Sequence, residues 1–434
     1  MSFKHLLVII FITNYIRVCK SDVTSEIESL ISSLLEPFES LSSLPRNYVF
    51  TEEEIYNNTQ DYLAGLVNED IYLSGPQLIQ KYGYDYEEHH VITTDGYNLS
   101  LYRIPGNGRV VFLMHGLTSS FVDWLTAGPE KGLAYLLAAA GYDVWMGNAR
   151  GNTYSKQNIL LSSSDSEFWD FSWDEIGRLD LPAMIDYVLD TTGQSSLTYV
   201  GHSQGTTAFF VLCSEKPEYN DKINFMVALS AVAWMKHVTN PLIQIAAQFD
   251  DVLYAVGKAL GLNDIAADDD LKKILTLTLC GDSFLASTIC SNVEFLICGF
   301  DFSQIDYKQT PVIFNHTPSG SSLKQLMHYA QLVLSGYFRK FDYGTSLNLI
   351  TYGSSTPPSY AVDKITVPTA IFYSYGDWLA NPIDVEEIRS NLKNVVDYYQ
   401  VGLLTFNHGD FLWAKDVKTL VYDRVLTLIA ENQP

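Results

Sequence analysis

The segment Gly201-His202-Ser203-Gln204-Gly205 is the most informative part of the chain, because of what lies on either side of it. An apolar, strand-like run precedes it at residues 197–200, and a helix-like run follows at residues 206–212. A serine on so tight a turn between a strand and a helix presents its hydroxyl outward, where a base can reach it. The flanking glycines are needed because side chains there would collide with the neighbouring strand and helix. The stretch therefore predicts a nucleophilic serine, Ser203, at the edge of a sheet.

Strands and helices alternate on both sides of this turn, which predicts an α/β fold with a mainly parallel sheet flanked by helices. An antiparallel pair at residues 89–94 and 97–104, joined at Asp95-Gly96, comes first. The further strands are expected at residues 110–114, 142–146, 197–200, 225–229, 368–373 and 395–401. The helices between and after them are expected at residues 132–140, 180–189, 206–212, 383–391 and 417–430.

The alternation breaks between residues 234 and 348, which read as a mostly helical cap inserted into the sheet domain. We expect residues 76–233 and 349–434 to form the two parts of that domain. The insertion follows the strand after Ser203, above the strand ends where ligands bind in such sheets. Within it, residues 241–262 carry one apolar helical stripe. This stripe fits either ordinary packing onto the sheet or a movable cap whose apolar face meets lipid.

The ends and the composition point to a secreted protein. Residues 1–21 resemble a secretory signal, with Lys4 and His5 before a short apolar core. Residues 22–75 read as a solvated N-terminal extension, and its removal as a pro-segment is left open. With a net charge of −23 over 434 residues, the chain is not expected to bind nucleic acid or anionic membranes. No transmembrane anchor is expected, because no other segment reaches about 18 uninterrupted apolar residues.

The cysteines and the glycosylation sequons are also typical of a secreted protein. Cleavage after Cys19 leaves four of the five cysteines, at positions 213, 280, 290 and 298, and the sequence does not choose among the three pairings. Cys280 and Cys290 enclose a short loop and are the favoured bridge, whereas Cys213 is expected to be a buried free thiol. Three sequons stand at Asn57, Asn98 and Asn315.

A serine nucleophile needs a base, and the base needs an acceptor that orients it. After a serine of this kind the acid and the histidine follow in that order, each beyond a strand end. Asp377 follows the next-to-last predicted strand, and His408 is the only one of nine histidines beyond a late strand. Taken alone, Asp377 reads as a turn residue or helix N-cap and His408 as a loop histidine. Asp384 and Asp410 are weaker acids for this role, because neither directly follows a strand.

An oxyanion needs hydrogen-bond donors beside the serine. The N–H groups of Gln204 and of Leu117, in the loop after the strand at residues 110–114, are predicted to supply them. The sequence contains no metal-ligand cluster, phosphate-binding loop or dinucleotide fingerprint. We therefore expect no metal and no cofactor.

Several longer stretches carry a family resemblance. Residues 148–155 (NARGNTYS), 200–207 (VGHSQGTT) and 407–413 (NHGDFLW) are similar to motifs of the acid lipase family, which includes gastric and lysosomal acid lipases. The resemblance extends from about Ile79 to Ile429. It implies an α/β-hydrolase fold with a cap at about residues 234–348, a secreted or lysosomal glycoprotein, and hydrolysis of triacylglycerol or cholesteryl esters. It also implies a Ser203–Asp377–His408 triad and a bridge between Cys280 and Cys290.

The chain departs from the family pattern at a few places. Ser230-Ala231 lacks the usual proline, Asn381 stands where aspartate is common, and Gly409 replaces an apolar residue. These departures leave the substrate and the pH optimum open. The sequence thus predicts a monomeric, secreted serine lipase acting on triacylglycerol at an oil–water or membrane interface, with the lysosome as the alternative location. Other readings are a cholesteryl-ester or phospholipid esterase and, less favoured, an inactive lipid-binding or storage protein.

Overall fold

The structure of the protein is a computed structural model that describes residues 51–248, 254, 263–265, 297–299 and 301–433. The predicted signal at residues 1–21, residues 22–50 of the extension, and both Cys280 and Cys290 lie outside the described residues. The chain divides into two compact units, and residues 59–267 with 297–434 form the unit that carries the sheet.

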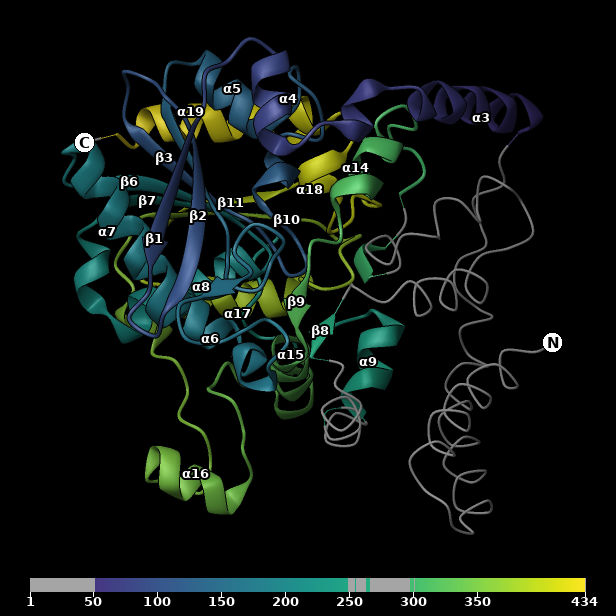
Figure 1. The fold of residues 1–434 in the computed structure, drawn as a ribbon. Helices are drawn as coiled ribbons and strands as arrows, with labels where there is room; N and C mark the ends of the chain where they lie inside the picture. The colour runs from purple at the N-terminus through teal and green to yellow at the C-terminus, as the bar shows by residue number, and fades with distance from the viewer. Residues whose placement is uncertain (1–50, 249–253, 255–262, 266–296, 300, 434) are drawn as a thin grey trace. The chain divides into compact units, whose positions relative to one another are not determined.

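The main sheet confirms the predicted, mainly parallel architecture (Figure 1). Its strands run in the order β1-β2-β4-β3-β6-β7-β10-β11, and the short β5 pairs with β2. Pairings that involve β1, β2 or β5 are antiparallel, and the remaining pairings in the sheet are parallel. The strands are β1 Glu87–Ile92, β2 Tyr97–Ile104, β3 Val110–Met114, β4 Asp143–Gly147, β5 Gln157–Asn158, β6 Leu197–His202, β7 Ile223–Leu229, β10 Thr369–Tyr373 and β11 Val395–Gln400.

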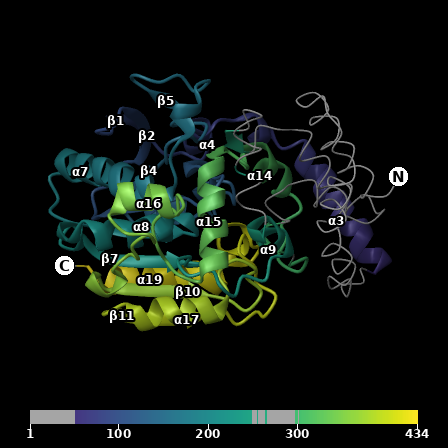
Figure 2. The same ribbon diagram turned by 90° about the horizontal axis from the view of Figure 1, so that it is seen from below.

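Helices cover both faces of this sheet (Figures 1 and 2). Side chains of one parallel strand alternate between the two faces, so Val111 and Phe112 belong to different buried clusters. One face packs against α4 Gly75–Lys81, α5 Leu133–Ala139, α18 Asp410–Trp413 and α19 Asp423–Glu431. The other packs against α7 Leu181–Thr192, α8 Gln204–Glu215 and α17 Pro382–Asn391. The five helices expected in the sheet domain are present, although the last begins as a π-helix at Lys418–Tyr422 before α19.

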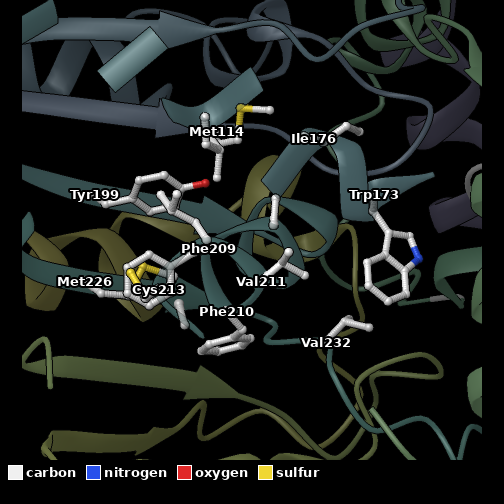
Figure 3. Packing of buried hydrophobic residues seen from close by; sticks show 14 of the residues in the cluster. Met114, Trp173, Ile176, Tyr199, Phe209, Phe210, Val211, Cys213, Met226 and Val232 are labelled. Carbon is white, nitrogen blue, oxygen red and sulfur yellow. The ribbon is translucent and has the colours of Figure 1, made fainter. Parts of the chain in front are cut away.

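The core between α8 and the sheet is densely apolar (Figure 3). Phe209, Cys213 and Met226 belong to one buried cluster that joins α8 to the sheet. The Tyr199 hydroxyl in this cluster donates a 2.8 Å hydrogen bond to the Gly205 carbonyl, which ties β6 to the first turn of α8. Cys213 is a buried free thiol, as predicted.

The described part of the insertion is fastened to loops of the sheet domain. The Ser319 N–H donates to the Thr118 carbonyl at 2.5 Å, and the Ser322 hydroxyl donates to the Phe171 carbonyl at 2.6 Å. The buried Lys324 ammonium lies 2.8 Å from a carboxylate oxygen of Asp170. Its elements are α9 Pro241–Gln248, β8 Asp264–Ile265, α14 Thr310–His316, β9 Ser321–Ser322, α15 Leu323–Ser335 and, near the end of the insertion, α16 Thr345–Tyr352.

The predicted extension contains a helix, α3 Glu52–Leu66, and the predicted helix at residues 241–262 is described only as α9 and Tyr254. In the part of the chain that the structure describes, no helix combines the length and the apolar character needed to cross a membrane.

Candidate active site

Ser203 sits at the junction of β6 and α8 in a conformation that few non-glycine residues adopt. Its φ is 51° and its ψ is −119°. A Cβ on Gly205 would lie 2.3 Å from the Met114 carbonyl oxygen, and one on Gly201 would lie 2.8 Å from the Gly205 carbonyl carbon. Both positions therefore require glycine, for the reason that the sequence suggests. Helix and strand meet closely enough here to hold Ser203 in a conformation that costs about 1–3 kcal/mol.

Asp377 and His408 meet beyond the ends of β10 and β11. The His408 Nδ1 atom lies 3.0 Å from each carboxylate oxygen of Asp377. The Leu379 and Ala380 N–H groups donate to Asp377 Oδ1 at 2.9 and 2.8 Å. Burial raises the pKa of this carboxyl, but His408 and the hydrogen-bond donors outweigh burial and hold the pKa below its usual value. Asp377 is therefore a buried carboxylate that faces one nitrogen of the imidazole.

The other imidazole nitrogen is free to act. His408 Nε2 is buried and has no hydrogen-bond partner among the described residues. Asn407 fixes the loop around His408, because its side-chain oxygen accepts from the Gly409 N–H at 2.8 Å and the Asp410 N–H at 3.1 Å. The imidazole thus has one nitrogen oriented by a carboxylate and one available to accept a proton.

The two weaker acid candidates are engaged elsewhere. Asp384 accepts from the His237 N–H at 2.8 Å and lies 2.8 Å from His237 Nδ1. Asp410 accepts from the Asn407 N–H at 2.7 Å, and burial raises its pKa well above the usual value. Among these three acids, only Asp377 contacts the imidazole of His408.

The His408 loop is docked against the turn that carries Ser203. The His202 Nε2 atom lies 3.0 Å from the His408 carbonyl oxygen, and the two rings are 5.0 Å apart between centroids. Burial lowers the pKa of His202 to about 3, so its ring is neutral. Because a carbonyl only accepts, the proton of this neutral ring sits on Nε2. His202, the chain neighbour of Ser203, thereby holds the His408 loop by one hydrogen bond.

The loop after β3 lies directly beside the serine. A Cβ on Gly116 would lie 3.2 Å from the Ser203 Cβ, which places the segment containing Leu117 against Ser203. His115 braces this segment, since its Nδ1 donates to the Gly116 carbonyl at 2.8 Å and its Nε2 accepts from the Ala149 N–H at 3.0 Å. Burial lowers the pKa of His115 to about 4, which keeps the ring neutral and able to do both.

Sequence patterns do not predict one residue of this site, Ser230. Ser230 directly follows β7, is fully buried, and donates a short hydrogen bond to Asp377 Oδ2. Its Oγ also lies 2.6 Å from His408 Nδ1. The available signal was its position after a parallel strand, at the same sheet edge as Ser203. That signal was weak, because a serine after a strand is common and the contact spans 178 residues of sequence.

These positions, on a sheet in this strand order, are those of an α/β-hydrolase. A family model described as "alpha/beta hydrolase fold" matches residues 109–263, and one described as "Partial alpha/beta-hydrolase lipase region" matches residues 76–128.

Sequence similarity to known proteins identifies the family within the α/β-hydrolases. Lipase 1 of Drosophila melanogaster is 41% identical over 369 residues, covering 84% of this chain and 81% of that protein. Gastric triacylglycerol lipase of Rattus norvegicus is 39% identical over 82% of this chain and 91% of its own length. The human gastric triacylglycerol lipase is 38% identical with the same coverage. The chain belongs to the acid lipase family, the group of α/β-hydrolases that includes gastric triacylglycerol lipase, and it is a carboxylic ester hydrolase.

Proposed function

We propose that the protein is a triacylglycerol lipase that works through an acyl-enzyme on Ser203. The observation that carries this proposal is the buried Asp377–His408 pair, whose free Nε2 belongs to a loop docked on the Ser203 turn. A serine hydroxyl becomes a useful nucleophile only when such a base accepts its proton.

In the first half-reaction, Ser203 Oγ attacks the ester carbonyl carbon while its proton passes to His408 Nε2. The oxyanion that forms is held by the N–H groups of Leu117 and Gln204. The ester C–O bond then breaks, and the imidazolium gives its proton to the departing alcohol. The products are a diacylglycerol and an acyl group on Ser203.

In the second half-reaction, water attacks the acyl carbonyl and gives its proton to His408 Nε2. The bond to Ser203 Oγ then breaks, the proton returns to Oγ, and a fatty acid leaves. In both halves the imidazole is transiently cationic, and the Asp377 carboxylate beside Nδ1 stabilises that charge. The depressed pKa of Asp377 supports this role, because it favours the ionised carboxylate beside the imidazole.

The relatives support triacylglycerol as the substrate, since several carry that lipid in their names. A neutral lipid also suits a chain with a net charge of −23, which anionic surfaces repel. We further propose that the protein is secreted after loss of residues 1–21, acts as a monomer at a lipid interface, and covers its site with residues 234–348. The Cys280–Cys290 bridge and glycosylation at Asn57, Asn98 and Asn315 belong to the same proposal.

Ser203→Ala is the test of the nucleophile. We expect kcat on a soluble short-chain ester to fall on the order of 10⁶-fold with folding intact, because no other group can form the acyl-enzyme. Ser214→Ala is the matched control, since it removes another buried serine hydroxyl of the same segment, one without a partner among the described residues. Undiminished turnover by Ser203→Ala would rule out the mechanism.

The substrate is tested separately with wild-type protein on emulsified triolein, cholesteryl oleate and phosphatidylcholine. The highest kcat/KM is expected on triolein. A higher value on either of the other two lipids would overturn triacylglycerol as the substrate and leave the serine mechanism untouched.

A further inference from the structure

We propose that Ser230 is a positioning residue for catalysis, whose hydroxyl bridges the Asp377 carboxylate and the His408 imidazole and fixes the proton on Nδ1. The inference rests on the proposed function, because it concerns how the base of that mechanism is held. It adds a fourth side chain to the three that the sequence predicts.

The backbone at Ser230 is held in a conformation that serine rarely adopts. Its φ is 53°, and among the described residues the other non-glycine positions with positive φ are Thr118 and Ser203. All three lie shortly beyond the ends of parallel strands that form the site. Glycine would adopt this conformation without strain, so a serine there points to a use for its side chain.

Neighbouring strands and the first turn of α8 hold this conformation in place. The Ser230 N–H donates to the Phe372 carbonyl of β10 at 2.9 Å. Two residues later, the Val232 N–H donates to Thr206 Oγ1 at 2.9 Å and the Val232 carbonyl accepts from Thr207 Oγ1 at 2.7 Å. The Ser230 hydroxyl is therefore presented from a fixed backbone that is anchored to the same helix as Ser203.

The hydrogen-bond roles at Ser230 follow from the acceptor beside it. A carboxylate can only accept, so the Ser230 hydroxyl donates its single proton to Asp377 Oδ2. Its oxygen then faces His408 Nδ1 with lone pairs, at 2.6 Å, closer than either carboxylate oxygen at 3.0 Å. The Nδ1 atom must therefore carry a proton and donate it. With Nδ1 protonated, the neutral imidazole has its lone pair on Nε2, where the Ser203 proton has to go.

The same contacts also stabilise the imidazolium that forms during the reaction. Its Nδ1–H then has three oxygen acceptors, two on Asp377 and one on Ser230. A buried hydroxyl with a purely structural role needs only one acceptor, such as a backbone carbonyl. Ser230 instead contacts both Asp377 and His408, which a purely structural role does not require.

Two substitutions separate the hydroxyl from the backbone. Ser230→Ala removes the hydroxyl and keeps a side chain at positive φ, whereas Ser230→Gly removes the hydroxyl and relieves the backbone. We expect both to lower kcat by about 10- to 100-fold, as a misplaced catalytic group does, with KM on a soluble short-chain ester within about 2-fold. We also expect the acidic limb of the kcat/KM–pH profile to move to lower pH, because the imidazolium has lost an acceptor. A purely structural role would leave that limb in place.

A double-mutant cycle tests whether Ser230 acts through Asp377. In the Asp377→Ala background, Ser230→Ala is expected to change kcat by less than about 2-fold, since the contact that it serves is already gone. Independent, additive losses would overturn the inference. Ser214→Ala serves as the control and is expected to keep the wild-type kcat and pH profile.

The outcomes distinguish this inference from the proposed function. An active Ser203→Ala variant would end the proposed mechanism whatever Ser230 does. An inactive Ser203→Ala variant, with wild-type kcat and pH profile in Ser230→Gly, would overturn the role of Ser230 alone. Should Ser230→Ala fail to fold, Ser230→Gly still gives the decisive result, because its backbone is unstrained.

Discussion

The Ser203 turn and the Asp377–His408 pair are held in place by different physics. At the turn, the close approach of β3, β6 and α8 leaves no room for a Cβ at Gly201 or Gly205. At the pair, loops from β10 and β11 are joined by hydrogen bonds between side chains 31 residues apart in sequence. One region is fixed by steric exclusion and the other by polar contacts.

The two regions are therefore sensitive to different substitutions. A substitution that adds a steric clash at the turn disturbs the junction of a strand and a helix, and hence the fold. A substitution that removes a hydrogen bond at the Asp377–His408 pair leaves the sheet intact, because the strands do not depend on contact between these side chains. Substitutions at the turn should therefore lower the free energy of unfolding, whereas substitutions at the pair should lower the catalytic rate.

Gly205→Ala should have the largest effect. Its Cβ would lie 2.3 Å from the Met114 carbonyl oxygen and 2.9 Å from the carbonyl carbon, so strand or helix must shift. We expect a loss on the order of 3 kcal/mol in the free energy of unfolding, together with loss of activity. Chemical denaturation measures the first and ester turnover the second. Gly402→Ala is the control, since nothing lies within 4 Å of its Cβ, and equal stability of the two variants would contradict steric exclusion.

Asp377→Asn should come next, as a change in rate with the fold kept. The amide cannot hold the imidazole in the required tautomer, so kcat should fall by about 10⁴-fold while the far-UV spectrum stays native. Asp384→Asn is the matched control: it alters another buried carboxylate beside a histidine, His237, and should keep kcat. A large loss of kcat in the control but not in Asp377→Asn would exchange the roles of the two acids.

The smallest expected effect concerns Asp123, a buried carboxyl whose hydrogen-bond donors are neutral. It lies in the turn Phe121–Trp124 after the loop beside Ser203, and accepts from the hydroxyls of Ser119 and of Thr317 in the insertion. Burial raises its pKa to about 6, and these neutral donors do not offset burial as His408 does for Asp377.

The pH dependence of stability follows from that shift. Because the folded pKa lies above the unfolded value, the native carboxyl takes up a proton that the unfolded chain does not as the pH falls through 6. This group should therefore add about 1 kcal/mol of stability between pH 7 and pH 5. Unfolding free energies of wild type and Asp123→Asn at both pH values measure it as a difference. Equal pH dependence in the two proteins would contradict the raised pKa.

Much of the fold could be predicted, because its signals are local. The residues of β2 and β3 match their predicted strands end for end, and α5 and α7 lie within a few residues of their predicted bounds. Alternating and continuous apolar runs specify such elements without reference to the rest of the chain. The prediction missed α16 and the two-residue pairing of β8 with β9, which apolar periodicity does not mark.

The candidate site was predictable from strand ends, and these favour Asp377 over Asp384 and Asp410 because it alone of the three directly follows a strand. Parallel strands bring their carboxyl ends to one edge, so residues after β3, β6, β10 and β11 were expected to lie near one another. Which side chains then touch depends on loop conformation. Asp384 and Asp410 carry the same carboxyl group as Asp377, but the structure shows them in hydrogen bonds with His237 and Asn407 instead.

Local sequence patterns specify the α/β architecture, the serine turn and the glycines beside it, because periodicity and steric exclusion act over a few residues. They also predict Asp377 as the acid for His408, whereas the second contact of this imidazole, with Ser230, is found in the folded structure alone. Ser230 reaches Asp377 across 147 residues of sequence and His408 across 178, and hydrogen bonds at such separations leave no local pattern. The serine turn is recognisable from five consecutive residues, whereas the contact of Ser230 with His408 forms only when the sheet brings distant residues together.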